Sequence, residues 1–254
     1  MNYIAVIARI TIIEAYRSRM LAIGLAIAVA GFGAALFLGE IAITDVAQVQ
    51  STIIAAFVRL GAVFLLIAFV VSSMVREFHD QTVAFTLSQP MPRHVYALGK
   101  LAGFFVTAAV LAVLACAPLL AFAPIERVIW WGGSLVLELL IVATASLFCV
   151  VTFTNFVAAF AAVGAFYVLA RSMDAIQIIA GSFGDSQSLA DQALTGFVSM
   201  LAFLLPHIDQ MTRASWLADP AAGIGELLPT LIQAPIYVAL LLGATLFDFH
   251  RQNL

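Results

Sequence analysis

Long runs of apolar residues, joined by short polar connections, make up most of this chain. The runs do not alternate between apolar and polar at every second position, as the strands of a membrane β-barrel would. A helix needs roughly 20 apolar residues to cross a hydrocarbon core about 30 Å thick. Runs that approach or exceed this length occupy residues 20–38, 53–75, 101–123, 130–151, 156–170 and 227–247. The pattern predicts an all-α, polytopic membrane protein with six transmembrane helices.

The composition agrees with this class. Of the 254 residues, 64% are hydrophobic and 10% are charged, and the mean hydropathy is +1.10. A typical soluble domain has about 45–50% apolar and about 25% charged residues. Once six helices and their connections are counted, too few residues remain for a separate folded domain. We therefore expect residues 1–254 to form a single transmembrane domain.

The N-terminal segment, residues 2–17, has an amphipathic pattern. Its apolar residues recur at helical spacing, and Arg9, Glu14 and Arg17 interrupt them. These interruptions, and the full-length apolar run that follows, argue against a cleaved secretory signal. We expect an interfacial helix in the plane of the membrane, with its arginines on the polar side. A charged N-terminal tail is the alternative.

The distribution of basic residues predicts the orientation, because cytoplasmic connections carry an excess of Lys and Arg. With the N-terminus inside, the cytoplasmic side carries Arg9, Arg17, Arg19, Arg76, Arg93, Lys100 and Arg251. The outer side then carries Arg127, Arg171 and Arg213. We therefore expect both termini in the cytoplasm.

Residues 76–98 form a long charged connection between the second and third apolar runs. Asp80 is placed to cap a short helix over residues 81–87, and Pro90 and Pro92 prevent its continuation. The shared face of this helix and of the preceding turn would carry Phe78, Thr82 and Phe85. The pattern predicts a short, rigid helix at the cytoplasmic surface, and an ordinary charged connection is the alternative.

The order of residues in this connection resembles a motif of ABC exporter permeases of the ABC-2 type. The residues that match the pattern E-x4-T-x4-L-S-x-P-x2-R-x5-G-K are Glu77, Thr82, Leu87, Ser88, Pro90, Arg93, Gly99 and Lys100. In that family a Gly usually precedes the Thr, and Gln81 stands there here. The predicted architecture is similar to the family as well, since an interfacial helix precedes six spans with both ends inside.

This resemblance implies the permease subunit of an ATP-driven exporter in the bacterial cytoplasmic (inner) membrane. Two permease copies, identical or closely related, would work with cytoplasmic ABC ATPase subunits whose closure rocks the membrane bundles. The resemblance implies that the short helix between the second and third spans is a coupling helix. The residues implied to couple to the ATPase are Glu77, Phe78, Thr82, Phe85, Leu87, Ser88, Pro90, Arg93 and Lys100. ATP and magnesium would bind the partner ATPase, and this chain would bind no cofactor.

The sequence carries no catalytic motif of its own. The G-x4-G-K-[ST] phosphate loop, the G-x-S-x-G nucleophile motif and the H-E-x2-H zinc motif are all missing from it. We therefore expect no enzyme activity, no catalytic residue and no metal site in this chain. We expect membrane lipid as a partner, and no nucleic acid.

Two charged residues lie within the predicted spans, where charges are rare and usually face protein or water. Arg59 and Glu138 each lie a similar number of residues from the outer end of their spans, so their depths agree within about 2 Å. We predict an intramembrane ion pair between them, either structural or lining an outward-facing cavity. The alternative is that Arg59 extends to the outer headgroups while Glu138 finds a hydroxyl partner or is protonated.

Residues 171–225 form a long segment on the outer side. Residues 175–180 and 189–205 are helix-compatible, with Gly and Pro residues between and after them, so we predict a structured outer cap. The second of these stretches would dip against the outer leaflet, pack on the bundle or form part of a re-entrant hairpin.

The sequence is compatible with more than one substrate class, and with either transport of a substrate or mechanical action on another protein. The few polar residues in the spans favour an amphipathic or lipid-linked substrate. An energy transducer that acts on an outer or periplasmic partner protein, without moving a small molecule, is the alternative function. An ion-driven transporter is expected to contain paired broken spans and polar residues near the midplane of the membrane, and these are missing from the sequence.

Overall fold

The computed structural model describes residues 3–41, 46–80, 92–183, 189–218 and 224–251. Within these ranges the chain forms α-helices, one 3-10 turn and connecting loops. The elements are α1 (Tyr3–Arg17), α2 (Met20–Gly39), α3 (Val46–His79), α5 (Arg93–Leu119), α6 (Ile125–Phe153), α7 (Phe156–Arg171), α8 (Met173–Phe183), α9 (Leu189–Leu204), η1 (Ile208–Gln210), α10 (Ser215–Ala218) and α11 (Ile224–Arg251).

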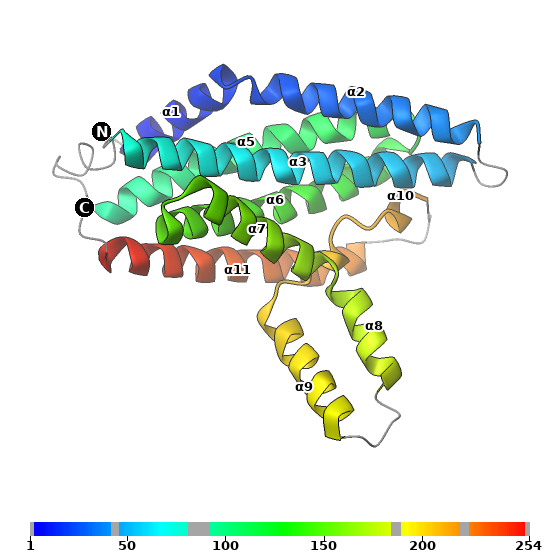
Figure 1. The fold of residues 1–254 in the computed structure, drawn as a ribbon. Helices are drawn as coiled ribbons and strands as arrows, with labels where there is room; N and C mark the ends of the chain where they lie inside the picture. Colours follow the sequence, from blue (N-terminus) through cyan, green and yellow to red (C-terminus); the bar gives the residue numbers. More distant parts are fainter. Residues whose placement is uncertain (1–2, 42–45, 81–91, 184–188, 219–223, 252–254) are drawn as a thin grey trace.

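The long helices run side by side in one elongated bundle (Figure 1). The start of α1 and the end of α11 lie at the same end of it, which we call the terminal end. The turn from α5 to α6 and the short helix α10 lie at the far end. The cytoplasmic location of both termini stays a prediction.

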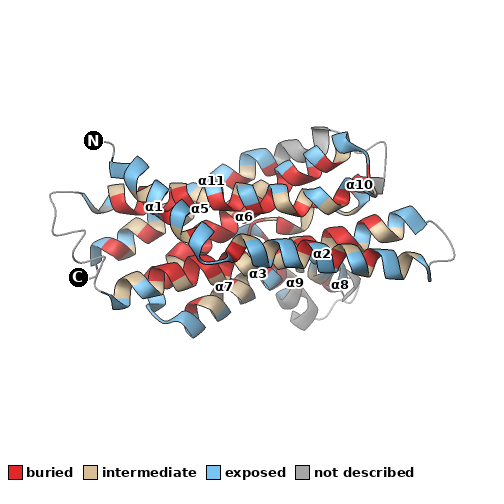
Figure 2. Cartoon of the chain, turned by 90° about the horizontal axis from the view of Figure 1, so that it is seen from above, coloured by how far each residue is buried: buried red, intermediate tan, exposed pale blue. Residues whose placement is uncertain are grey.

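Helix α6 is the centre of the bundle, because α3, α5, α7 and α11 all pack against it. Its residues from Ile141 to Leu147 are buried without interruption, which requires a helix that is apolar or small on every face. Figure 2 shows that buried positions concentrate where α3, α5 and α6 meet, whereas exposed positions lie along the outside of the bundle. The outside is itself largely apolar, with exposed side chains such as Val29, Val113 and Ile236. An apolar exterior around a packed core is what a hydrocarbon surrounding requires.

The structure confirms a polytopic helical membrane protein. Helices α2, α3, α5, α6 and α11 contain segments long and apolar enough to cross a membrane. The fifth predicted span, residues 156–170, differs from the others, because α7 and the first part of α8 form a pair that is bent by 52°. The spans therefore number five, or six if this bent pair counts as one, among the residues described.

Helix α1 lies within the segment 2–17 for which a helix is predicted, and its position at the membrane interface stays a prediction. It packs chiefly against α5. Two glycines four residues apart on α5 permit this contact. A Cβ atom on Gly103 would lie 2.6 Å from Cβ of Thr11, and one on Gly99 would lie 2.8 Å from Cβ of Ile7. Gly99, which belongs to the motif that resembles ABC-2 permeases, therefore has a packing role here.

Helices α8 and α9 form a hairpin that leaves the bundle and points away from it (Figure 1). They overlap the two helix-compatible stretches predicted for the outer cap. The two helices pack on each other, while Ile178, Phe197, Met200 and Phe203 are exposed. After α9 the chain returns to the bundle through η1 and α10.

Candidate functional site

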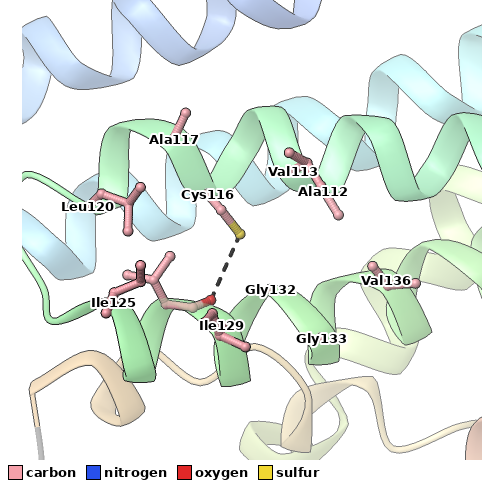
Figure 3. A pocket seen from close by; sticks show the side chains of 11 residues that line it. Ala112, Val113, Cys116, Ala117, Leu120, Ile125, Ile129, Gly132, Gly133 and Val136 are labelled. Atoms are coloured by element: carbon pink, nitrogen blue, oxygen red, sulfur yellow. Dashed lines mark hydrogen bonds between the residues drawn. The ribbon is translucent and has the colours of Figure 1, made fainter.

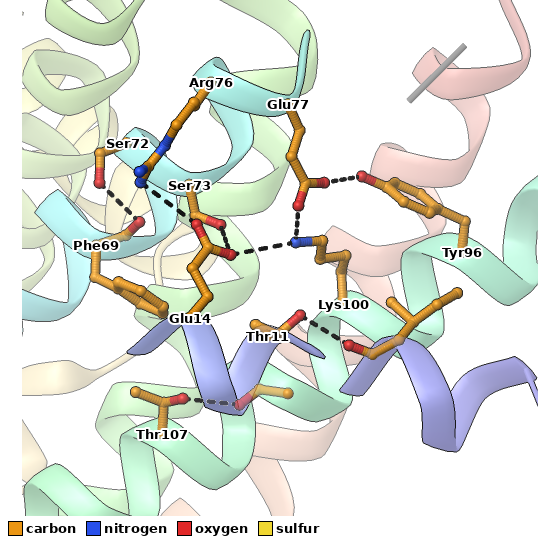
Figure 4. Close-up of polar contacts among 12 residues, drawn as sticks. Thr11, Glu14, Phe69, Ser72, Ser73, Arg76, Glu77, Tyr96, Lys100 and Thr107 are labelled. Carbon is orange, nitrogen blue, oxygen red and sulfur yellow. Dashed lines mark hydrogen bonds and ion pairs between the residues drawn. The ribbon is translucent and has the colours of Figure 1, made fainter. Parts of the chain in front are cut away.

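A cluster of charged and polar side chains joins α1, α3 and α5 at the terminal end, and we call it the terminal charge cluster (Figure 4). The Glu77 carboxylate accepts hydrogen bonds from the Tyr96 hydroxyl and from the Lys100 ammonium. Lys100 Nζ also lies 3.7 Å from Glu14 Oε2. Ser73 Oγ donates to the same Glu14 oxygen at 2.8 Å.

Lys100 is the centre of this cluster, since its residue is only 2% exposed. Its ammonium lies between the carboxylates of Glu14 and Glu77. Arg76 supplies the second positive charge, with Nη2 3.4 Å from Glu14 Oε1. The formal charges of the four groups therefore cancel. A buried charge is tolerated when it is paired and hydrogen-bonded in this way.

The predicted coupling residues fall into two groups. Glu77 and Lys100 bind each other, and Phe78 packs half-buried against the hydrophobic core. Arg93 begins α5. Thr82, Phe85, Leu87, Ser88 and Pro90, with the short helix predicted at 81–87, lie outside the residues that the structure describes.

The sequence analysis did not predict that Glu14, Ser73 and Tyr96 belong with Glu77 and Lys100. Glu14 interrupts an otherwise apolar stretch of α1, and a carboxylate at such a position needs a cationic partner. That signal was present, but it does not say which cation is the partner.

A second polar group lies inside the bundle, towards the far end, and is built around Thr212, so we call it the Thr212 centre. Glu138 is fully buried and accepts two hydrogen bonds, from Tyr167 Oη at 2.8 Å and from Thr212 Oγ1 at 2.6 Å. The backbone N–H of Thr212 donates to Ser134 Oγ at 2.9 Å. Helices α6 and α7 therefore hold one residue of the loop that follows α9.

Two arginines bind the backbone carbonyls of the same loop. Arg59 Nη1 donates to the carbonyl of Thr212 at 3.1 Å. Arg171 Nη1 donates to the carbonyls of Ile208 at 2.6 Å and Met211 at 2.7 Å. Among the described contacts there is no direct ion pair between Arg59 and Glu138. Thr212 bridges them instead, through its carbonyl and its hydroxyl.

The Thr212 centre holds irregular backbone in place. Ile208, Met211 and Thr212 are all buried, and Thr212 has a φ of 48°. That value is unusual for a β-branched residue and costs about 1–3 kcal/mol, so it persists only where the surrounding contacts fix it. Non-helical backbone close to the membrane core is tolerated only where protein covers it and satisfies its polar groups. The arginines and Glu138 provide these partners.

Asp209 lies in the same loop, but the hydrogen-bonding capacity of its carboxylate is less fully used. Its Oδ1 atom is buried and has no hydrogen-bond partner in the part of the chain described. Burial raises the pKa of its carboxyl above the usual value, and a hydrogen bond to its own backbone opposes this effect.

The described residues contain no group of His, Cys, Asp and Glu side chains able to hold a metal ion. Cys116 and Cys149 are free thiols. A comparison of the sequence with protein-family models and with curated proteins finds no match.

Proposed function

We propose that this chain is the membrane permease subunit of an ATP-driven exporter of the ABC-2 type. The single observation that carries the proposal is the terminal charge cluster. It ties together α1 and the two helix ends, of α3 and α5, that flank the connection resembling the coupling segment of that family. Glu77 and Lys100, two residues of the matching motif, supply its central ion pair.

The terminal charge cluster is suited to transmitting force from the predicted coupling segment to the helices of the bundle. A push on residues 81–91 would act on the end of α3 and the start of α5 at once. Because Glu14 and Lys100 connect these ends to α1, the three helices would move as one body. Helices α3 and α5 also pack against α6, so the displacement would reach the centre of the bundle.

The proposed working unit contains two copies of this chain, or this chain and a close relative, with cytoplasmic ATPase subunits that bind ATP and magnesium. It lies in the bacterial inner membrane with both termini in the cytoplasm. The Thr212 centre then lies towards the outer side of the membrane, where it would block the route of the substrate until the bundle moves. The apolar interior supports an amphipathic or lipid-linked substrate.

The test is purification of the tagged full-length chain from its native membranes in mild detergent. The wild type is compared with a Phe85→Asp, Arg93→Glu double variant, and with Phe153→Asp as control. Phe153 is exposed at the end of α6 and lies outside the coupling segment. We expect an ABC ATPase subunit to accompany the wild type and the control, and to be lost from the double variant. Absence of any ATPase from the wild-type preparation would contradict the proposal.

The α8–α9 hairpin favours a second candidate function, in which the same ATP-driven bundle acts on an outer partner protein. Its exposed Phe197, Met200 and Phe203 form an apolar surface away from the bundle. In the same purification, a Met200→Asp, Phe203→Asp variant should then lose a non-ATPase partner while keeping the ATPase. Phe37→Asp, at an exposed position of α2, is the control. If no such partner is present with the wild type, the exporter remains and the transducer is rejected.

A further inference from the structure

An apolar crevice runs between α5 and α6 near the far end of the bundle (Figure 3). Its volume is about 430 Å³, and its walls include Val113 and Cys116 from α5, Leu120 just after α5, and Ile125, Ile129 and Gly133 from α6. None of the described residues that line it is charged. The two helices that form it are both long and apolar enough to cross a membrane.

Two adjacent glycines create the space. A Cβ atom on Gly132 would lie only 2.5 Å from the Cys116 sulfur, so this glycine lets α5 and α6 approach each other. A Cβ atom on Gly133 would meet no atom within 4 Å, so this glycine leaves the crevice open. Leu120, Ile125 and Ile129 stand at the rim and are well exposed.

The crevice is continuous with the lipid-facing surface of the bundle. Val106, Val110 and Val113 form an exposed stripe at helical spacing along α5, and Val113, at 71% exposure, belongs to both the stripe and the crevice. Water is a poor occupant, because an ordered water needs two to four polar partners. A transmembrane helix is about 10–12 Å wide with its side chains. Because α5 and α6 pack directly on each other, such a helix is too wide to enter the crevice between them and would rest on its rim.

We propose that this crevice binds one acyl chain of a membrane lipid. The crevice volume of about 430 Å³ is many times the roughly 10–15 Å³ that one water needs on the same measure, so it accommodates a run of several methylenes. The wall offers apolar contacts along its length and no site for a polar headgroup, so the headgroup would stay in the interface. The proposal depends on the membrane-spanning helices and is independent of whether the protein transports anything.

The test uses the full-length chain in lipid nanodiscs. A fraction of the phospholipid carries a photoreactive diazirine in the middle of one acyl chain, and mass spectrometry locates the crosslinks after illumination. The key variant is Gly133→Leu, which fills the crevice where there is open space. Gly33→Leu is the matched control, because Gly33 on the exposed face of α2 is equally free of neighbours. A smaller change, Gly133→Ala, should give an intermediate effect.

We expect crosslinks to concentrate on the crevice residues of the wild type and of Gly33→Leu. In Gly133→Leu they should fall to the level found on the exposed faces of α2 and α11, while the thermal unfolding temperature stays close to that of the wild type. Equal labelling of all lipid-facing helices in the wild type would overturn the proposal, since it would indicate ordinary surrounding lipid. So would protection of the crevice by a second copy of the chain, detected as crevice labelling that appears only when the protein is monomeric.

Discussion

The two polar groups of this protein perform opposite structural tasks. The terminal charge cluster joins three helices through side chains alone, with Lys100 between Glu14 and Glu77. The Thr212 centre uses side chains to bind backbone, since Arg59 and Arg171 both donate to loop carbonyls. The first links the ends of three helices to one another, whereas the second holds an irregular loop against the bundle.

The two groups should therefore respond differently to the substitution of one side chain. In the terminal charge cluster, the loss of one charge leaves its partners without compensation but breaks no backbone contact. In the Thr212 centre, the loss of Arg59 or Arg171 removes the side-chain donor that binds the carbonyl of Thr212 or of Met211. A change in the cluster should therefore uncouple helices, and a change in the centre should release the loop.

The largest effect is expected from Lys100→Met. The substitution keeps the length of the side chain and removes the one buried ammonium, which leaves Glu77 and Glu14 facing each other's charge. Breaking a buried pair in this way costs about 3 kcal/mol or more. Thermal unfolding of the purified chain in detergent measures the loss.

Two further variants test whether pairing is the cause. A Lys100→Met, Glu77→Gln double variant should recover part of the stability, because it removes the uncompensated carboxylate. Arg76→Met should cost less than about 1 kcal/mol, because that side chain is mostly exposed. If the double variant is less stable than Lys100→Met by the full cost of Glu77→Gln alone, the two groups act independently.

Next in size is Glu138→Gln in the Thr212 centre. The amide keeps one acceptor for Tyr167 or Thr212 but removes the negative charge near Arg59 and Arg171, at a cost of about 2 kcal/mol. Glu126→Gln, at an exposed position of α6, is the control and should be neutral. The same change in an Arg59→Gln background should cost less, because the charge that Glu138 balances has gone. Equal losses of stability in both backgrounds would mean that Glu138 stabilises the protein only through its hydrogen bonds with the hydroxyls of Tyr167 and Thr212.

Much of the fold follows from the length of the apolar runs. The run at 20–38 corresponds to α2 (Met20–Gly39), and the run at 156–170 to α7 (Phe156–Arg171). The run at 53–75 underestimates α3 (Val46–His79), because polar residues at both ends continue the helix beyond the hydrocarbon. Apolar length reports the part of a helix that lies in lipid, and it does not report where the helix ends.

The sites were less predictable than the fold. Depth along two helices suggested that Arg59 and Glu138 meet, and both do reach Thr212. The bridging residue is 153 positions from Arg59 in the chain, in a loop with no periodic pattern. Likewise Glu14 on α1 comes near Lys100 on α5 where Gly99 and Gly103 let the two helices approach each other. Which face of an apolar helix meets which neighbour is decided by tertiary packing, and a single sequence does not specify it.

Gly103→Ala tests that dependence and should have a smaller effect than Lys100→Met. The added methyl group would lie 2.6 Å from Cβ of Thr11 and 3.1 Å from the carbonyl oxygen of Ala8, so α1 must shift outward. Overpacking of this kind costs about 1–3 kcal/mol. Gly243→Ala, at a position with open space, is the control. The separation of α1 from α5, followed by spin labels on the two helices, should increase in Gly103→Ala alone; an unchanged separation would mean that the cluster holds α1 without the glycine contact.

The smallest effect is expected from Asp209→Asn, and it should depend on pH. Since burial raises the pKa of the Asp209 carboxyl in the folded protein, the folded state holds its proton more tightly than the unfolded state does. The stability contributed by this group is therefore fully present below the ordinary pKa of 3.8 and is lost as the pH rises through the raised value. Asn cannot ionise, so the variant should match the wild type at pH 3.5 and exceed it slightly at pH 7 in thermal unfolding. A difference of the same size at both pH values would show that the neutral amide, rather than the removal of a buried charge, stabilises the loop.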